Sequence, residues 1–148
     1  VNLLSHRDQL ALATAGEIPW AQVVEESLRH QAPVATLILR FAVRDVTDAP
    51  TGMTFAQGDA IAVNYAAANR DPHVHGADAD HFDITRSTAR DHLAFGYGAH
   101  LCLGAELART EARIALESRV APVPGRGLAR DTRGIGARPP RSTHCPPP

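Results

Sequence analysis

The sequence predicts an α-rich fold with small β-sheets (α+β), and three observations support this prediction. Two segments before Pro33 and one segment after Cys102 repeat apolar residues at helical spacing. The stretch between Pro33 and Tyr65 is rich in β-branched and aromatic residues and is divided by glycine turns. The 148 residues suffice for one domain with a modest core.

Two helices are expected at the beginning of the chain. Asn2 to Ala15 carries leucines at helical spacing, and Gly16 is a suitable end for this helix. Pro19 suits the first turn of a second helix, which is expected to run to about His30.

Extended and irregular structure is expected in the middle of the chain. Val34 to Val46 and Ala60 to Tyr65 are rich in strand-forming residues, and Met53 to Phe55 is a short strand between turns. Ala66 to Arg70 is predicted as a short helix. The polar stretch from Asp71 to Arg90 is predicted to be a long irregular segment, of a kind that is often functional.

The last helix is expected from Leu103 to about Glu117. Leu103, Leu107 and Ile114 form its apolar stripe, and Arg113 can pair with Glu117 one turn later. Residues 119–148 change character to a Pro/Gly/Arg-rich tail without periodicity, which is predicted to be disordered. Residues 1–118 are therefore predicted to form the folded unit.

Charge and composition exclude several classes of protein. The net charge of −1 indicates no strong nucleic-acid or membrane interaction, and no apolar run approaches the roughly 20 residues of a membrane span. We expect no signal segment, since the first residues show no charged-then-apolar pattern, and the two cysteines, Cys102 and Cys145, lie in unlike contexts. We therefore expect a reduced, cytoplasmic protein without a disulfide.

One motif dominates the sequence, namely the run Phe95-Gly96-Tyr97-Gly98-Ala99-His100-Leu101-Cys102-Leu103-Gly104. It places a thiol in a glycine-rich loop that opens directly onto a helix, where free N–H groups and the helix dipole favour the thiolate. Glycine allows tight turns and a close approach to a flat partner. This is the chemistry that a single cysteine needs to bind haem iron, although a lone thiol is more commonly a buried structural residue.

The run resembles the haem-binding signature of the cytochromes P-450, the haem-thiolate monooxygenases. Phe95, Gly98, Cys102 and Gly104 fill the four positions of the family pattern, and residues 105–111 resemble the helix that follows the cysteine in soluble bacterial members. The resemblance covers about residues 2–118. It implies the C-terminal part of the P-450 fold, without the N-terminal half and the long central helix.

The resemblance implies haem b as the cofactor and Cys102 as the axial ligand of its iron. Arg40 and His100 match the family's contacts to the haem propionates, and Phe95, Gly98 and Gly104 are the further cofactor-binding positions. From the sequence alone, an exposed strand arginine is the less favoured alternative for Arg40. A zinc site at His100 and Cys102 is disfavoured, because the eight histidines and two cysteines show no typical ligand spacing.

A second constellation is expected to be structural. Glu26 and Arg29 are three residues apart and share a helix face, which by itself predicts a surface ion pair worth roughly 0–1 kcal/mol. Their context resembles the family's Glu-x-x-Arg helix, and Arg86 matches the arginine that completes a buried network with it. The resemblance thus implies that Glu26, Arg29 and Arg86 lock the loop that presents Cys102.

The residues after this helix are candidates for the wall of a substrate pocket. The resemblance places Ala35, Thr36, Leu37 and Ile38 above the haem, whereas the pattern alone is equally consistent with ordinary exposed strand packing. The oxygen-activating acid and alcohol of the family lie on the central helix, upstream of the matched region. The sequence therefore identifies no catalytic residue.

The implied activity is monooxygenation, in which one atom of O2 is inserted into a small organic substrate. The implied partners are a ferredoxin or a flavodoxin-type electron donor and that substrate, with no nucleic acid and no membrane. Arg109 and Arg113 could offer positive charge to a donor or could form a solvated helix face. The alternative is a non-catalytic remnant or a haem-binding module, and we expect no turnover from this chain alone.

Overall fold

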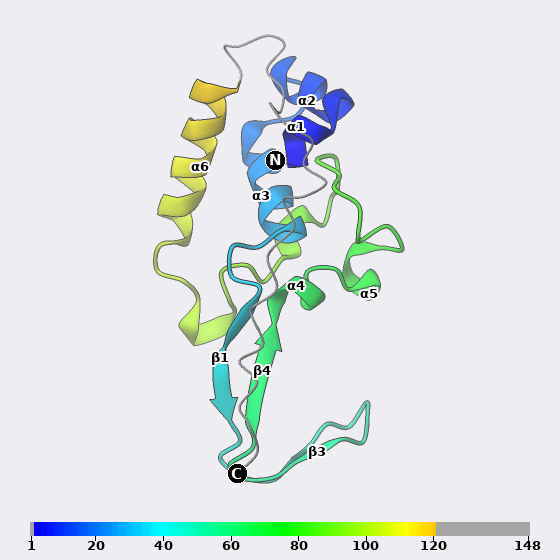
Figure 1. Ribbon diagram of the computed structural model, residues 1–148, viewed down its shortest axis with the longest axis vertical. Helices are drawn as coiled ribbons and strands as arrows, with labels where there is room; N and C mark the ends of the chain where they lie inside the picture. The colour runs from blue at the N-terminus through cyan, green and yellow to red at the C-terminus, as the bar shows by residue number, and fades with distance from the viewer. Residues whose placement is uncertain (1, 121–148) are drawn as a thin grey trace, which may run out of the picture.

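The computed structural model describes residues 2–120, so residues 121–148 of the predicted tail, including Cys145, lie outside the described residues, whereas Arg119 is the last residue of a helix. Helices gather around the central helix α3, and two antiparallel sheets of two strands each complete the fold. In Figure 1, α6 lies beside α3, α1 and α2 lie near one end of α3, and β1 and β4 extend from the opposite end. The predicted α-rich class with small sheets is confirmed.

The first predicted helix is in fact two helices, α1 (Asn2–Ser5) and α2 (Arg7–Thr14). The backbone leaves the helical conformation at His6, with φ −110° and ψ 84°. The His6 ring bonds back to the carbonyl of Asn2 over 2.8 Å and lies 5.3 Å from the Phe82 ring. The prediction of one unbroken helix was wrong because this tertiary contact competes with the helical path.

The second predicted helix is confirmed as α3 (Trp20–His30), which begins directly after Pro19. Gly16, with φ 79°, lies in the turn between α2 and α3. A positive φ is readily adopted by glycine, which explains why the chain changes direction there.

The predicted extended segment from Val34 to Val46 divides into two strands. β1 (Thr36–Phe41) pairs antiparallel with β4 (Ala60–Asn64), and the register shifts between Leu37 and Arg40. β2 (Val46–Thr47) pairs with β3 (Thr54–Phe55) to form a separate hairpin. This irregular register lies between two residues, Leu37 and Arg40, that line the pocket described below.

The remaining segments are short until the last helix. They are α4 (Tyr65–Ala68), α5 (Pro72–His75), and the two 3-10 turns at Ala89–Asp91 and Gly98–His100, followed by α6 (Ala105–Arg119). The segment from residue 71 to 90 is mostly turns, as predicted. None of the described helices is long and apolar enough to cross a membrane.

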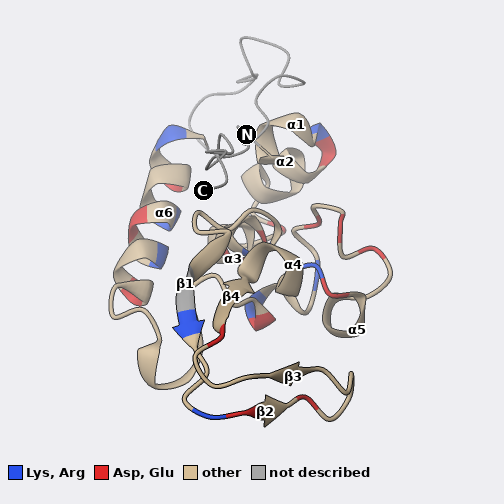
Figure 2. Ribbon diagram, turned by 60° about the horizontal axis from the view of Figure 1, so that its bottom comes forward, with Lys and Arg blue, Asp and Glu red and all other residues tan. Residues whose placement is uncertain are grey.

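The hydrophobic core lies where α1, α2 and α3 meet the irregular segment, and it consists of Leu3, Ala13, Val23, Phe82 and Ile84. Leu116 of α6 packs against this cluster, whereas Leu103, Leu107 and Ile114 are exposed. The apolar stripe predicted for this helix therefore faces solvent in the described chain. Figure 2 shows acidic and basic residues along α6, and the predicted Arg113–Glu117 pair is present at 3.0 Å.

The different surroundings of Ile84 and Leu107 give a test of this packing. Ile84→Ala should lower the free energy of unfolding by about 2–5 kcal/mol, because Ile84 is fully buried. Leu107→Ala is the matched control and should change it by no more than about 0.5 kcal/mol, because Leu107 is 64% exposed. Urea unfolding measures both values, and equal losses would contradict this placement of α6.

Candidate functional site

The cysteine loop is shaped by two glycines and by backbone hydrogen bonds. Gly96 and Gly98 have φ values of 80° and 70°, a conformation that strongly favours glycine. The N–H of Cys102 donates to the carbonyl of Phe95 over 2.9 Å, and the N–H of Leu101 donates to Gly98 over 3.0 Å. The loop thus closes on itself and leaves the Cys102 thiol free and exposed.

Gly104 has a different role from the other two glycines. Its φ of −86° is open to any residue, so its backbone conformation does not require glycine. A Cβ atom at this position would lie 3.9 Å from Cys102 Sγ. Glycine therefore keeps the space beside the sulfur clear, immediately before α6 begins.

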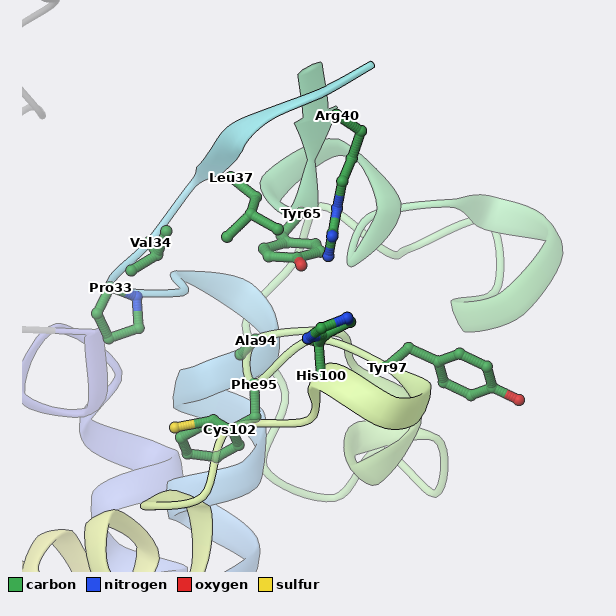
Figure 3. A pocket seen from close by; sticks show the side chains of 11 residues that line it. Pro33, Val34, Leu37, Arg40, Tyr65, Ala94, Phe95, Tyr97, His100 and Cys102 are labelled. Carbon is green, nitrogen blue, oxygen red and sulfur yellow. The ribbon is translucent and has the colours of Figure 1, made fainter. Parts of the chain in front are cut away.

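The thiol opens onto a pocket of about 420 Å³. Figure 3 shows Arg40 extending from β1 toward His100, with Leu37 and Tyr65 beside it, while Tyr97 points away. Within residues 2–120, the side chains of Arg40 and His100 form no hydrogen bond or ion pair. The pocket is lined by Pro33, Val34, Leu37, Arg40, Tyr65, Ala94, Phe95, Gly96, Tyr97, His100 and Cys102.

The structure brings most of the predicted site residues together at this pocket. Arg40, Phe95, His100, Cys102 and Leu37 line it, whereas Gly98 and Gly104 shape the loop without lining the pocket. Of the four residues predicted as the substrate wall, Leu37 lines the pocket, whereas Ala35 and Thr36 are exposed and do not line it. The Ile38 side chain lies outside the described residues.

Tyr65 is a lining residue that the sequence analysis missed. It is buried at the junction of β4 and α4, and its hydroxyl oxygen lies 3.5 Å from the position that a Cβ of residue 96 would take. A Cβ at residue 96 would make an ordinary van der Waals contact with this hydroxyl, so the positive φ is what favours glycine at this position. The only signal in the sequence was an aromatic residue at the end of a predicted strand.

Glu26 and Arg29 form an ion pair in which neither side chain is exposed to solvent. Arg29 Nε and Nη2 donate to the two carboxylate oxygens of Glu26 over 2.7 and 2.8 Å. Its other N–H groups donate to the carbonyls of Asn69, Ala79 and His81 over 2.7–2.9 Å. All five donors of the guanidinium group are thus satisfied, which is what the burial of this charge requires.

Arg86 extends this network. Its Nε lies 3.7 Å from Glu26 Oε1, and its Nη1 donates to Asp78 Oδ1 over 2.9 Å. The hydrogen bond from Arg86 lowers the pKa of Asp78, against a smaller opposing effect of desolvation. The N–H of Asp83 also donates to Glu26 Oε1 over 2.8 Å, so the carboxylate binds helix α3 to the segment before the cysteine loop.

A second buried carboxylate, Glu25, was not identified from the sequence. It accepts hydrogen bonds from His92 Nε2 over 3.1 Å and from Arg109 Nε over 2.7 Å. Desolvation by burial raises the pKa of Glu25, but the bonds and charges of His92 and Arg109 together outweigh it and lower that pKa to about 2. Because Arg109 also pairs with Glu106 and Arg113 pairs with Glu117, the positive charge of both arginines is balanced locally.

The structure offers no support for a zinc site in the described part of the chain, because no three His, Cys, Asp or Glu side chains there are placed to hold an ion. The buried histidines have other partners. His92 bonds to Glu25, and His75 lies 3.2 Å from the hydroxyl of Thr88.

Comparison with known proteins identifies the family, because the family model described as cytochrome P-450 matches residues 5–120. The chain belongs to the cytochrome P-450 family. It is 40% identical over 127 residues to 2-hydroxy-5-methyl-1-naphthoate 7-hydroxylase of Streptomyces carzinostaticus. The aligned region covers 86% of this chain and 30% of that relative. It is 44% identical over 126 residues to cytochrome P-450 monooxygenase PikC of Streptomyces venezuelae, covering 85% of this chain and 29% of the relative.

Solved structures show the same relationship. The chain superimposes on CYP154A1 from Streptomyces coelicolor A3(2) with a TM-score of 0.81 and 53% sequence identity, covering 87% of this chain and 32% of that structure. The chain therefore has part of the P-450 fold and spans about a third of the length of the relatives that it matches.

P-450 proteins are haem proteins, and the residues at this pocket fit that cofactor. A free thiol such as that of Cys102 suits haem iron as a soft ligand, and the side chains of Arg40 and His100, which have no partner within residues 2–120, carry N–H groups that suit the anionic edge of a porphyrin. Phe95, Leu37 and Val34 give the same pocket an apolar lining, which would fit the face of a flat macrocycle.

The buried Glu26–Arg29 pair should dominate the stability of this region. Arg29→Met should lower the free energy of unfolding by about 3–5 kcal/mol, because it leaves the Glu26 carboxylate buried without its main partner. Arg113→Met is the control, since its ion pair with Glu117 is 40–42% exposed, and it should cost no more than about 1 kcal/mol. Equal losses of unfolding free energy in the two variants, measured by urea unfolding, would contradict the dominant role of the buried pair.

The lowered pKa of Glu25 predicts a dependence of stability on pH. A carboxylate whose folded pKa is about 2 and whose ordinary pKa is 4.5 stabilises the fold above pH 4.5, and this contribution is lost as the pH falls toward 2. The difference in unfolding free energy between the parent chain and Glu25→Gln should be constant near neutral pH and should shrink below pH 4.5. Denaturant titrations across this range test it, and a constant difference down to low pH would contradict it.

Proposed function

We propose that this chain carries the haem-ligand side of a cytochrome P-450 monooxygenase, with Cys102 as the axial ligand of the haem iron. The observation that supports this most strongly is the pocket itself. It brings Arg40 of β1 together with Phe95, His100 and Cys102 of the cysteine loop, and its only sulfur ligand among the described residues is a free thiol.

Each residue has a proposed task toward haem b. Arg40 and His100 bind the propionates, and Phe95 packs against the macrocycle. Gly98 keeps the loop tight, and Gly104 leaves space beside the sulfur for the cofactor. When bound, haem with a thiolate ligand supplies the activation of O2 and the insertion of one oxygen atom into an organic substrate.

The Glu26, Arg29 and Arg86 network is proposed to hold the segment that leads into the cysteine loop. Its support is the set of bonds from Arg29 and Arg86 to carbonyls of residues 69–81, which fix that segment against α3. This role is structural, because none of the three residues lines the pocket.

The proposed substrate is a small organic molecule, and the proposed reaction is hydroxylation, as the name of the naphthoate 7-hydroxylase indicates for that relative. We propose Ala35, Thr36, Leu37 and Ile38 as the wall that such a substrate contacts, and the support for this is that Leu37 lines the pocket and that all four lie in or beside β1. The proposed electron donor is a ferredoxin or a flavodoxin-type protein.

Turnover is proposed to require protein outside this chain. The relatives are about three times as long as this chain. The family resemblance implies that the residues which activate oxygen lie upstream of the matched region. On this basis the chain alone is a haem-binding portion without monooxygenase activity. Product formation by this chain with NADPH and a reductase system would contradict that proposal.

The absorption spectrum of the chain with added haem, reduced and exposed to CO, tests the ligand. The parent chain should show the red-shifted Soret band of thiolate ligation, and Cys102→Ala should abolish it because the sulfur is lost. Cys145→Ala is the matched control and should keep the band. Failure of the parent to bind haem, or survival of the band in Cys102→Ala, would refute the assignment.

A further inference from the structure

The Glu25 carboxylate bonds to one residue before Cys102 in the sequence and to one residue after it. His92 precedes the cysteine and Arg109 follows it on α6, and both bond to the Glu25 carboxylate on α3, with a second contact of 3.3 Å from Arg109 Nη2. Glu25 is only 2% exposed, so the bonds form away from solvent. One carboxylate therefore attaches both ends of the segment from residue 92 to residue 109 to the same helix.

Phe95 connects this arrangement to the ligand. The guanidinium carbon of Arg109 lies 4.8 Å from the centre of the Phe95 ring, and the His92 ring lies 6.0 Å from it. The carbonyl of Phe95 in turn accepts the hydrogen bond from the N–H of Cys102. The two partners of Glu25 thus hold the aromatic residue whose backbone fixes the cysteine.

Glu25 and Glu26 act on different parts of the chain although they are adjacent. Glu26 and Arg29 contact residues between 69 and 86, whereas Glu25 contacts residues 92 and 109, with Arg90 at 3.9 Å as a further, exposed neighbour. Glu25 does not line the pocket. Its effect on the cysteine can therefore only be exerted through the residues that it holds.

We propose that Glu25 is a positioning residue for Cys102, which orders the cysteine loop by binding His92 and Arg109 at its two ends. The local ordering is a property of the chain without cofactor. Its consequence for the haem ligand rests on the proposed function above.

Amide hydrogen exchange of the full chain, followed by mass spectrometry, tests the ordering. Glu25→Gln keeps the shape of the side chain and removes its charge, so peptides from residues 93–104 should exchange about tenfold faster because the loop opens more often. Peptides from β1 and β4 should be unchanged. Faster exchange throughout the chain, or no change in residues 93–104, would overturn the proposal.

Two further variants keep the test decisive. Glu106→Gln is the matched control, because Glu106 binds the same Arg109 from an 88% exposed position, and it should leave exchange unchanged. Arg109→Met removes the partner instead of the carboxylate and should accelerate exchange in residues 93–104, whereas Arg113→Met should not. If Glu25→Gln does not fold, unchanged exchange in Arg109→Met refutes the proposal by itself.

The reduced CO spectrum separates this proposal from the proposed function. In the haem-loaded chain, Glu25→Gln should shift part of the Soret intensity from the red-shifted thiolate band to shorter wavelength, and Glu106→Gln should not. If the parent binds no haem while Glu25→Gln still loosens the loop, the proposed function fails and the ordering role of Glu25 stands. If the parent shows the thiolate band and Glu25→Gln leaves both band and exchange unchanged, the positioning role fails alone.

Discussion

The buried charge pair of Glu26 and Arg29 is the interaction on which the rest of the structure depends. A guanidinium group without solvent contact is tolerable only when its donors are all bonded, and here the carbonyls of Asn69, Ala79 and His81 complete the set that Glu26 begins. The irregular segment between residues 69 and 86 has no strand or long helix to order it. Arg29 fixes three points of this segment through these carbonyls, and Phe82 and Ile84 bury its later part in the core.

Helix α3 uses two successive acidic residues to order two successive parts of the chain. Adjacent side chains on a helix point about 100° apart, so Glu26 faces the segment before the cysteine loop while Glu25 faces the loop's own ends. The apolar core, by comparison, lies on the side of α1 and α2. The pocket is thus supported mainly by polar contacts, whose directionality fixes a single arrangement of the loop.

The parts that could be predicted from the sequence are those encoded locally. The helix after Pro19, the glycine-rich loop around Cys102 and the Glu26–Arg29 spacing all depend on residues a few positions apart. The break at His6 was missed because a contact with Phe82 helps to cause it. Glu25 bonds to His92, which is 67 positions away in the sequence, and to Arg109, which is 84 positions away. No periodicity in the sequence predicts contacts over such separations.

The orientation of α6 is a second feature that the sequence pattern could not predict. Its amphipathic pattern correctly predicts a helix with one apolar face, but a pattern cannot say which face meets α3. In the structure Ala105, Arg109 and Leu116 meet the rest of the chain, and Leu103, Leu107 and Ile114 remain exposed. Burial of the apolar stripe thus contributes little to the stability of this chain. Because α6 begins three residues after Cys102, the bond from Arg109 to Glu25 directly links α3 to the helix that follows the cysteine loop.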